Sequence, residues 1–213
     1  MRTNYDLIAP TYDDQPYRLK SVDEHLQAFV AEHPDIQGLA VLDLGCGTGN
    51  QLVANREAFP RALMVGLDLF AGMLGQAQKK GGEIHWVQGN GATPPFADES
   101  FDFISNQFSF HHVDDKPGML EEVFRLLKPG GRFVMTNVCP RKMPGFLVYR
   151  YFPGVRETDL ADFMPFRDIA RLMEEVGFPQ VDVELRRWHH DQDLRDFAAW
   201  TKQPHACSQL TAI

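Results

Sequence analysis

The sequence predicts an α/β protein with a doubly wound, mostly parallel sheet and helices on both faces. Short apolar runs typical of buried strands alternate along the chain with amphipathic stretches of helical period. The first apolar run leads directly into a glycine-rich turn, which is how a nucleotide-binding unit begins. With 213 residues, 44% of them hydrophobic and 23% charged, the chain is long enough to bury a core as a single domain over residues 1–213.

The positions of the individual strands and helices follow from these hydrophobic patterns and from the residues that interrupt them. We expect strands at residues 41–44, 63–67, 84–87, 101–105, 133–136 and 181–185, and helices at residues 22–32, 51–59, 71–80, 116–127, 167–176 and 194–201. Pro60, Gly81 and Gly177 end three of the helices, because proline and glycine interrupt or cap helices. Residues 129–131 form a turn before the fifth strand. No clear seventh strand follows the sixth, so we expect either that the chain is a truncated form or that the sheet is closed in another way, such as by a neighbouring subunit.

The stretch VLDLGCGTGN indicates a nucleoside site. Gly45, Gly47 and Gly49 allow a tight turn on which a ligand can lie against backbone N–H groups. Asp68 follows the second strand at about the separation at which such units place a carboxylate on ribose hydroxyls. The turn does not match the dinucleotide pattern G-x-G-x-x-G, and Asp43 beside it would repel phosphate and suits an ammonium group. These two features contradict a nicotinamide oxidoreductase.

The order of a strand carrying Asp43, the GCGTG turn and an acidic residue after the next strand resembles the class I S-adenosylmethionine-dependent methyltransferases. The resemblance continues in VQGNGATPPFADESFDFI, NQFSFHHVDD and LLKPGGRF and covers roughly residues 5–183. It implies the Rossmann-like methyltransferase fold and the cofactor S-adenosyl-L-methionine, with S-adenosyl-L-homocysteine as product. It also implies transfer by in-line displacement, for which a protein mainly aligns the reactants and excludes water.

The resemblance further implies which residues hold the cofactor. Asp43 and the glycine turn would hold the methionine part, Asp68 the ribose, and Leu69 with Asn90 the adenine. Family members usually carry aspartate where this chain has Asn90, and an asparagine can still accept a hydrogen bond through its amide oxygen. The full expected set is Tyr12, Asp43, Gly45, Cys46, Gly47, Gly49, Asp68, Leu69, Asn90, Gly91, Asn106 and Gln107.

Residues 1–35 are expected to form an N-terminal lid and helical region. They contain two Tyr-Asp pairs, which begin at Tyr5 and Tyr12. In the family this leader often folds over the cofactor, and Tyr12 looks like the residue that covers it. The chemistry is sound because a cation is attracted to the face of an aromatic ring. Plain amphipathic packing of the leader is the alternative.

The acceptor site is expected after the fourth strand and in residues 137–166. Ligands bind at the carboxyl ends of strands in such sheets, and His111 is a candidate general base because histidine readily takes a proton near neutral pH. We expect His111 and His112 to point in different directions, so that both cannot face one ion. Residues 137–166 have no regular hydrophobic pattern but are rich in aromatic residues. This composition favours a segment that covers the acceptor pocket. A satellite hydrophobic cluster or a partner-binding surface is the alternative. The candidate substrate-binding residues are Tyr5, Phe108, Tyr149, Arg150 and Phe163.

Charge and composition narrow the possible partners. The net charge of −8 and the lack of Lys and Arg blocks argue against nucleic acid and favour a small-molecule substrate. No apolar run is long enough to cross a bilayer and the start lacks an apolar signal core, so we expect a cytoplasmic protein with no membrane partner, as a monomer or homodimer. The three cysteines show no C-x-x-C spacing, which indicates neither a metal site nor a disulfide framework.

The expected function is S-adenosylmethionine-dependent transfer of a methyl group to a small-molecule acceptor, with oxygen, nitrogen or carbon left open. Whether a general base is needed depends on that acceptor, since a hydroxyl must lose a proton. The alternative is a non-catalytic S-adenosylmethionine-binding regulatory or assembly protein, because binding and turnover use the same residues.

Overall fold

The structure is a computed structural model of the chain, and it describes residues 4–187 and 193–202. The chain divides into two compact units, which we describe separately. Residues 5–137 form the first unit, and Asn4 belongs with the described residues from 138 onward to the second. The sheet and all the predicted cofactor residues lie in the first unit. The expected single domain over the whole chain stays a prediction.

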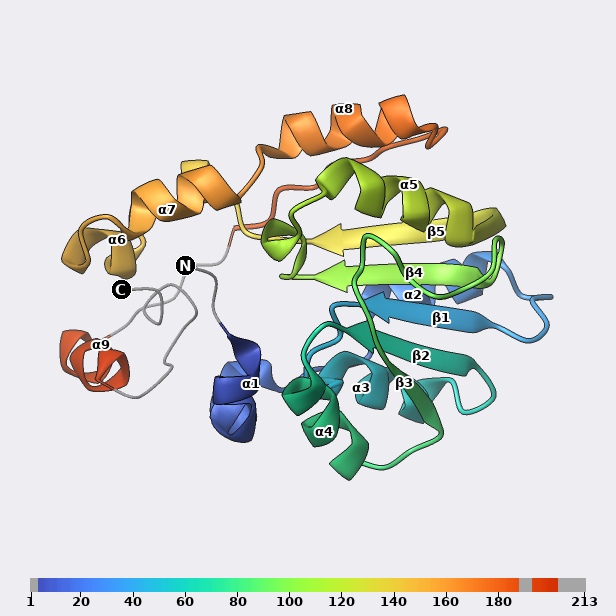
Figure 1. Cartoon of the computed structure of the whole chain (residues 1–213), viewed down its shortest axis with the longest axis horizontal. Helices are drawn as coiled ribbons and strands as arrows, with labels where there is room; N and C mark the ends of the chain where they lie inside the picture. Colours follow the sequence, from blue (N-terminus) through green and yellow to red (C-terminus); the bar gives the residue numbers. More distant parts are fainter. Residues whose placement is uncertain (1–3, 188–192, 203–213) are drawn as a thin grey trace. The chain divides into compact units, whose positions relative to one another are not determined.

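A five-stranded parallel sheet forms the centre of the first unit (Figure 1). Its strands are β1 Ala40–Leu44, β2 Leu63–Asp68, β3 Ile84–Gln88, β4 Phe101–Gln107 and β5 Leu127–Thr136, in the order β3-β2-β1-β4-β5. The chain moves outward from β1 to β3 and then returns to the other side of β1 with β4. Ligands of such sheets bind at the carboxyl ends of the strands, beside this reversal. The predicted doubly wound α/β sheet is confirmed.

Burial explains why β1 lies in the centre of the sheet. All five of its residues are buried, as expected for a parallel strand covered on both faces. Val41 belongs to a hydrophobic cluster with Leu26 of α2 (Glu24–Glu32) and Leu52 of α3 (Asn50–Ala58). The unit also contains α1 Tyr5–Ile8, α4 Ala71–Lys79 and α5 Lys116–Leu126, with the 3-10 helices η1 Ala9–Asp14, η2 Pro16–Arg18 and η3 Phe110–His112.

The predicted turn at residues 129–131 lies inside β5. The pairing of β5 with β4 is irregular between Phe101 and Phe103, and Gly130 has a φ of 80°. Glycine adopts this left-handed conformation without strain. The turn is therefore present as an irregularity of the strand, which begins earlier than predicted.

The second unit is helical in its described residues. It contains η4 Pro140–Lys142, α6 Leu147–Tyr151, α7 Val155–Asp162, α8 Phe166–Val176 and α9 Leu194–Thr201. Val148, Val155 and Phe197 form a buried cluster, with several aromatic side chains packed against it. The irregular hydrophobic pattern of residues 137–166 thus corresponds to short helices joined by turns.

The predicted sixth strand at residues 181–185 is wrong. These residues belong to no helix or strand, and Val183 and Leu185 are 48% and 54% exposed. Alternating apolar residues suit a half-buried strand, but a strand also needs a hydrogen-bonded neighbour. In the described part of the chain, the sheet contains β1 to β5 and this segment pairs with none of them.

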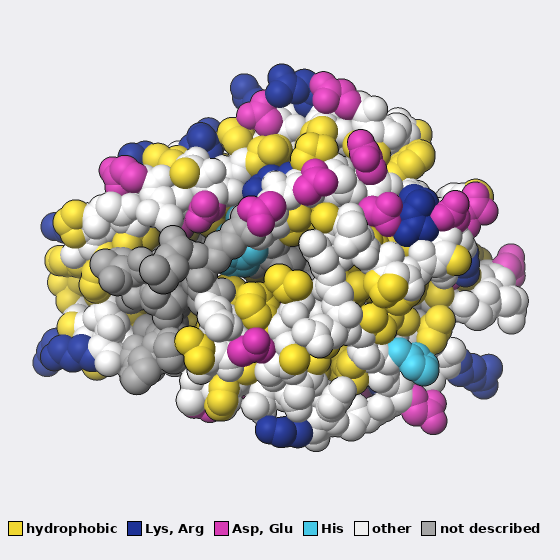
Figure 2. All heavy atoms as spheres, viewed as in Figure 1, with side chains coloured by type: hydrophobic (Ala, Val, Ile, Leu, Met, Phe, Trp, Pro, Cys, Tyr) yellow, Lys and Arg dark blue, Asp and Glu magenta, His cyan; other side chains and the backbone are white. Residues whose placement is uncertain are grey.

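The surface of the described residues carries charges of both signs. Figure 2 shows acidic and basic side chains interspersed on the visible face. The whole chain has a formal net charge of −8. None of the helices within residues 4–187 and 193–202 combines the length and apolar character needed to cross a membrane.

Candidate active site

The glycine turn lies at the carboxyl end of β1 and is tied to β2. The N–H groups of Gly45 and Cys46 donate to the carbonyl oxygen of Leu67, at 2.7 and 3.1 Å. Gly45, Gly47 and Gly49 have positive φ angles of 73°, 55° and 76°. These angles explain why the turn consists largely of glycine. In Figure 1 the strands end on the side of the sheet on which α1 lies, so the turn and the leader share one edge.

At two of these glycines there is also no room for a side chain. A Cβ on Gly45 would lie 2.2 Å from Oγ of Ser109, and a Cβ on Gly49 would lie 2.3 Å from the ring of Trp86. A Cβ on Gly47 would meet only the flexible end of a methionine side chain, at 3.3 Å. The backbone of Gly47 is therefore the least crowded of the three, as a ligand that lies on the turn requires.

Asp68 links the end of β2 to the glycine turn. Its carboxylate accepts hydrogen bonds from the N–H groups of Gly47 at 2.8 Å and Phe70 at 2.9 Å. Burial raises the pKa of Asp68, while these backbone hydrogen bonds oppose the rise. After the hydrogen bonds from the backbone of Gly47, Phe70 and Leu69, the carboxylate keeps lone-pair capacity for a further donor, such as a ribose hydroxyl. Leu69 follows with 57% of its surface exposed.

Asp43 is buried at the end of β1, where only 3% of its surface is exposed. Oγ of Ser105 donates a hydrogen bond to its carboxylate at 2.8 Å. Burial raises the pKa of Asp43 to about 7, against the effect of the Ser105 hydrogen bond, and the nearby charge of Asp23 adds to the rise. An ammonium group beside Asp43 would favour its ionised form.

Asn106, in β4, offers a buried acceptor to a ligand. Its Nδ2 donates to the carbonyl oxygen of Leu44 at 2.8 Å and to Oγ of Ser109 at 2.5 Å. Its Oδ1 is buried and has no hydrogen-bond partner among the described residues. Since an unpaired buried acceptor costs free energy, a ligand donor is favoured here. Asn106 and Asp43 both lie at the carboxyl ends of neighbouring strands, and Asn106 keeps an acceptor there for a ligand donor.

Gln107 joins the end of β4 to the residues that precede α2. Its Oε1 accepts a hydrogen bond from Nζ of Lys20 at 3.0 Å, and its Nε2 donates to Asp23 at 3.3 Å and to Gln51 at 3.2 Å. Nζ of Lys20 also lies 5.4 Å from the ring centre of Phe108, whose φ is 54°. The sequence did not single out Lys20, because one lysine in an irregular segment forms no pattern.

Asn90 and Gly91 lie in the loop of residues 89–100 that follows β3. Oδ1 of Asn90 accepts a hydrogen bond from the N–H of Ala92 at 3.0 Å. An amide oxygen accepts two hydrogen bonds, so this atom can also accept one from an adenine amino group.

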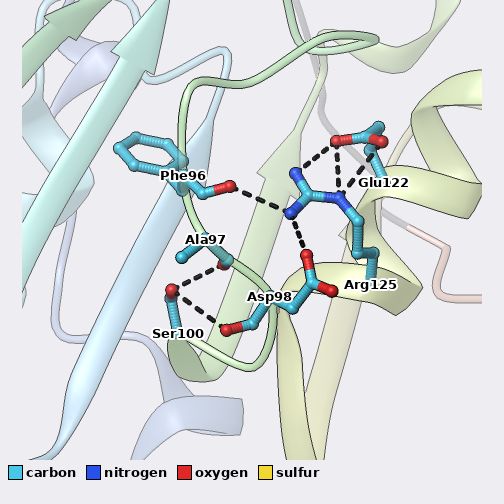
Figure 3. Close-up of polar contacts among 6 residues, drawn as sticks. All are labelled: Phe96, Ala97, Asp98, Ser100, Glu122 and Arg125. Carbon is cyan, nitrogen blue, oxygen red and sulfur yellow. Dashed lines mark hydrogen bonds and ion pairs between the residues drawn. The ribbon is translucent and has the colours of Figure 1, made fainter.

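Arg125 of α5 holds the far part of this loop (Figure 3). Its Nη1 donates to the carbonyl oxygen of Phe96 at 2.9 Å and pairs with Asp98 at 2.6 Å, while its Nη2 pairs with Glu122 at 2.6 Å. The loop that carries Asn90 is thereby fixed to α5.

Tyr12, in η1, already has a cation on its ring. The guanidinium of Arg18 lies 4.0 Å from the ring centre, and its Nη1 donates to the Tyr12 hydroxyl at 2.6 Å. Burial raises the pKa of Tyr12, the charge of Arg18 lowers it, and the charge of Asp68 contributes to the rise. The Arg18 guanidinium thus occupies one face of the Tyr12 ring, and the predicted role of Tyr12 as a cover of the cofactor stays a prediction.

Tyr5, His111 and His112 form an aromatic group beside Tyr12. The Tyr5 hydroxyl lies 2.8 Å from Nε2 of His112, and the rings of Tyr5 and Tyr12 are 6.2 Å apart. The rings of His111 and His112 are 3.9 Å apart, so the prediction that they point apart is wrong; long planar side chains in a short 3-10 helix can turn toward each other. Burial lowers the pKa of His111 to about 3, with further effects of His112 and Lys116, so its imidazole is neutral at neutral pH.

Two aspartates anchor the leader to the first unit. Asp6 accepts a hydrogen bond at 2.6 Å from the N–H of Gly72, at the start of α4, whose own N-cap residue supplies no side-chain hydrogen bond. Asp13 accepts one at 2.7 Å from Thr48 and pairs with Lys80 at 2.6 Å. The repeated Tyr-Asp pair is the sequence signal for these anchors, although only its tyrosines were predicted to act.

The remaining predicted substrate residues lie in the second unit. The Tyr149 hydroxyl donates to Asp159 at 2.7 Å, Phe163 is 4% exposed, and the Arg150 guanidinium lies 5.7 Å from the ring centre of Tyr151. Tyr149 and Phe163 thus contribute to the interior of their own unit. That these residues form one substrate site with Tyr5 and Phe108 of the first unit stays a prediction.

The amino-terminal side of the sheet contains a separate hollow of about 430 Å³. His33, Ile36, Asp102 and residues 129–131 are among the residues that line it, and none of the predicted site residues does. In the described part of the chain, no three histidine, cysteine or acidic residues are grouped so that they could hold a metal ion.

Known proteins resemble this chain in both sequence and fold. The family model described as "Methyltransferase domain" matches residues 42–135. The demethylmenaquinone methyltransferase of Lactococcus lactis subsp. lactis is 36% identical over 198 residues, which cover 80% of this chain and 77% of that protein. The ubiquinone/menaquinone biosynthesis C-methyltransferase UbiE of Desulfotalea psychrophila is 34% identical over 140 residues, which cover 64% and 57%. The crystal structure of a SAM dependent methyltransferase from Aquifex aeolicus matches with a TM-score of 0.62 at 20% identity, over 83% of this chain and 89% of that chain.

The structural match shows the fold, and the sequence matches show the family. Both sequence relatives are named as methyltransferases, which supports catalysis over a purely regulatory or assembly role. The chain belongs to the class I S-adenosylmethionine-dependent methyltransferases, and it is an enzyme that transfers a methyl group from S-adenosylmethionine to a small molecule.

Proposed function

We propose that this enzyme methylates a ring carbon of a hydroquinone, the reduced form of a quinone. The observation that carries the proposal is the 36% identity to a demethylmenaquinone methyltransferase along 80% of the chain. The relative from Desulfotalea psychrophila is named as a C-methyltransferase, which supports carbon over oxygen or nitrogen as the acceptor atom.

The chemistry requires the reduced form of the acceptor. The ring carbons of an oxidised quinone are electrophilic, whereas loss of a hydroxyl proton from a hydroquinone places negative charge on the neighbouring ring carbon. That carbon forms a bond to the methyl group as the methyl–sulfur bond breaks. The ring then loses the proton of the same carbon and the oxygen regains a proton, so that one proton is released overall. The enzyme must therefore align the reactants, exclude water and accept a proton.

The first unit contains groups suited to hold the cofactor, which supplies an electrophilic methyl group on a positive sulfur. We place its amino group at the carboxyl end of β4, where Oδ1 of Asn106 can accept a hydrogen bond and Asp43 of the neighbouring strand adds negative charge, and we place its ribose hydroxyls on Asp68. We place the adenine against Leu69 and Asn90. The unpaired Oδ1 of Asn106 supports the first assignment, and the remaining lone pairs of Asp68 support the second.

His111 is our candidate for the proton acceptor. Burial lowers its pKa to about 3 in the ligand-free protein, so the imidazole is neutral but only weakly basic, and the negative charge of a bound hydroquinone anion must raise this pKa for His111 to act. We expect His111→Gln to lower kcat by roughly a hundredfold, the lower end of what general-base catalysis contributes. The dissociation constant of the cofactor should stay unchanged in the same variant. A kcat equal to that of the wild type would remove His111 from the mechanism.

A methylation assay with a panel of acceptors tests the proposal. The enzyme is incubated with S-adenosylmethionine carrying a deuterated methyl group and with a prenylated naphthohydroquinone, and products are identified by mass spectrometry. Control acceptors are the same quinone in its oxidised form, a catechol and an aliphatic amine. We expect label on a ring carbon of the hydroquinone alone. Label on the catechol oxygen or on the amine, with none on the hydroquinone, would contradict carbon methylation.

We also propose the cytoplasmic location and the monomeric or homodimeric state that the sequence predicts. Light scattering coupled to size-exclusion chromatography measures the oligomeric state. A mass above that of two chains would contradict this part of the proposal.

A further inference from the structure

We propose that Asp13 and Lys80 act as a latch that keeps the leader, residues 5–18, closed over the cofactor and slows cofactor dissociation. The proposal rests on the cofactor positions given under the proposed function. It does not depend on which acceptor is methylated. Asp13 and Lys80 are positioning residues, because they act on the cofactor through Tyr12 and the glycine turn.

Asp13 is held by three side chains from other parts of the unit. Its Oδ1 accepts hydrogen bonds from Oγ1 of Thr48 at 2.7 Å and from Nδ2 of Asn50 at 2.8 Å, and its Oδ2 pairs with Nζ of Lys80 at 2.6 Å. Burial alone would raise the pKa of Asp13, but the hydrogen bonds from Lys80, Thr48 and Asn50 outweigh burial and lower it. The environment thus stabilises the carboxylate in its ionised form.

Lys80 has its three ammonium hydrogens directed to the same cluster. Besides the carboxylate of Asp13, its Nζ contacts the carbonyl oxygen of Thr48 at 2.6 Å and Oδ1 of Asn50 at 2.5 Å. The side chains of Lys80 and Asp13 are 24% and 35% exposed, so water screens their attraction only in part. A lysine with three partners and an aspartate with three partners define one geometry for the leader.

The latch is joined to the cofactor site on both sides. Thr48 and Asn50 flank Gly49 of the glycine turn, so their hydrogen bonds also fix the turn. Asp13 directly follows Tyr12, which we place over the cofactor as part of this proposal. Opening of the latch would therefore release the tyrosine and loosen the turn together.

A second anchor makes this opening local. Asp6 accepts its hydrogen bond from the start of α4 independently of the latch. With Asp13 released, the leader therefore stays attached at Asp6 and opens between the two anchors. Such an opening should change the escape of a bound cofactor more than the folding of the unit.

The rate at which S-adenosylhomocysteine leaves the intact protein measures the latch. Radiolabelled product is bound, an excess of unlabelled product is added, and loss of label is followed by rapid filtration. We expect Asp13→Asn and Lys80→Met each to raise the dissociation rate by about tenfold, the effect of losing a charged hydrogen bond. The double variant should be little faster than either single one, because both remove the same interaction.

Neighbouring residues of the same charge supply the controls. Asp14 and Lys79 are exposed, so Asp14→Asn and Lys79→Met should leave the dissociation rate unchanged. In a Tyr12→Ala background, Asp13→Asn should have a smaller effect than in the wild type, since only the part of the latch that acts through the glycine turn remains. Trypsin should cleave after Arg18 or Lys20 faster in Asp13→Asn than in Asp14→Asn, both without ligand.

The outcomes separate this inference from the choice of acceptor. A protein that releases S-adenosylhomocysteine faster in both latch variants supports the latch even where no hydroquinone is methylated. Wild-type dissociation rates in Asp13→Asn and Lys80→Met would overturn it. A lower thermal unfolding midpoint in the ligand-free variants, together with an unchanged dissociation rate, would assign the cluster a purely structural role. This result would also overturn the proposed latch.

Discussion

Asp68 combines a structural and a proposed binding role, which a substitution can separate. Its backbone partners, Gly47 and Phe70, shape the turn, while its remaining lone pairs are placed on the ribose. We expect Asp68→Ala to weaken cofactor binding by more than tenfold, since a charged acceptor of two hydroxyl groups is lost. Calorimetry on the folded variant measures this, with circular dichroism as the folding check. An unchanged dissociation constant would refute the ribose assignment.

Asp43 should make cofactor binding depend on pH. Burial raises its pKa to about 7 from the usual 3.8, so the ligand-free folded protein holds a proton that the unfolded chain has lost. The contribution of Asp43 to stability therefore falls as pH rises between about 4 and about 7. The cofactor ammonium needs the ionised carboxylate, so its affinity should rise over the upper part of this range.

Calorimetric titrations between about pH 5.5 and about pH 8.5 test this behaviour. Asp43→Asn should bind more weakly than the wild type and with a flatter pH dependence. If the variant kept the full dependence, the responsible group would be another one.

At the scale of an element, the Trp86 side chain of β3 packs closely against the backbone of β2. A Cβ on Gly66, in the middle of β2, would lie 2.6 Å from the Trp86 ring and 2.8 Å from Sγ of Cys46. We expect Gly66→Ala to lower the free energy of unfolding by about 1–3 kcal/mol, because the crowded ring must move. Gly75→Ala in α4 is the control, since nothing lies within 4 Å of its Cβ. Because alanine favours helix over glycine, this variant should gain about 0.5–1 kcal/mol in urea unfolding.

The loop of residues 89–100 depends on Arg125, whose side chain is 30% exposed. We expect Arg125→Ala to lower the free energy of unfolding by about 1 kcal/mol, because partly exposed ion pairs are screened and the bond to Phe96 is also lost. Arg171→Ala in α8 is the control, since that side chain is 67% exposed and should change stability by less than about 0.5 kcal/mol. A larger effect in the control than in Arg125→Ala would contradict this view of the loop.

The same elements show how far the sequence could predict the fold. β1 is buried on both faces and ends in a glycine turn, so its position and its turn were both predictable. Residues 181–185 have the alternation of a strand, but pairing depends on a neighbour that the pattern does not specify. The irregularity within β5 likewise depends on its register with β4.

The candidate site was predictable where it follows strand ends. Asp43, Asp68 and Asn106 stand at motif positions, and the structure brings them to one edge of the sheet. Lys20 and Lys80 were missed because their partners lie far along the chain: Gln107 is 87 positions from Lys20 and Thr48 is 32 from Lys80. Hydrogen bonds between such distant residues leave no periodic signal.

At the scale of the whole molecule, charge and cofactor are compatible. The chain has a formal net charge of −8, and S-adenosylmethionine carries a positive sulfur. An acidic protein attracts a cationic ligand and repels a pyrophosphate. The charge of Asp43 has the same effect within the site. The choice of cofactor should therefore be set by the site and supported by the molecule as a whole.

Parallel calorimetric titrations of the wild-type protein with S-adenosylmethionine, S-adenosylhomocysteine and NAD test this choice of cofactor most directly. We expect micromolar binding of the first two ligands and none of NAD, because Asp43 disfavours its pyrophosphate. Binding of NAD, or of none of the three, would contradict the assignment of the glycine turn, Asp43 and Asp68 as the cofactor site.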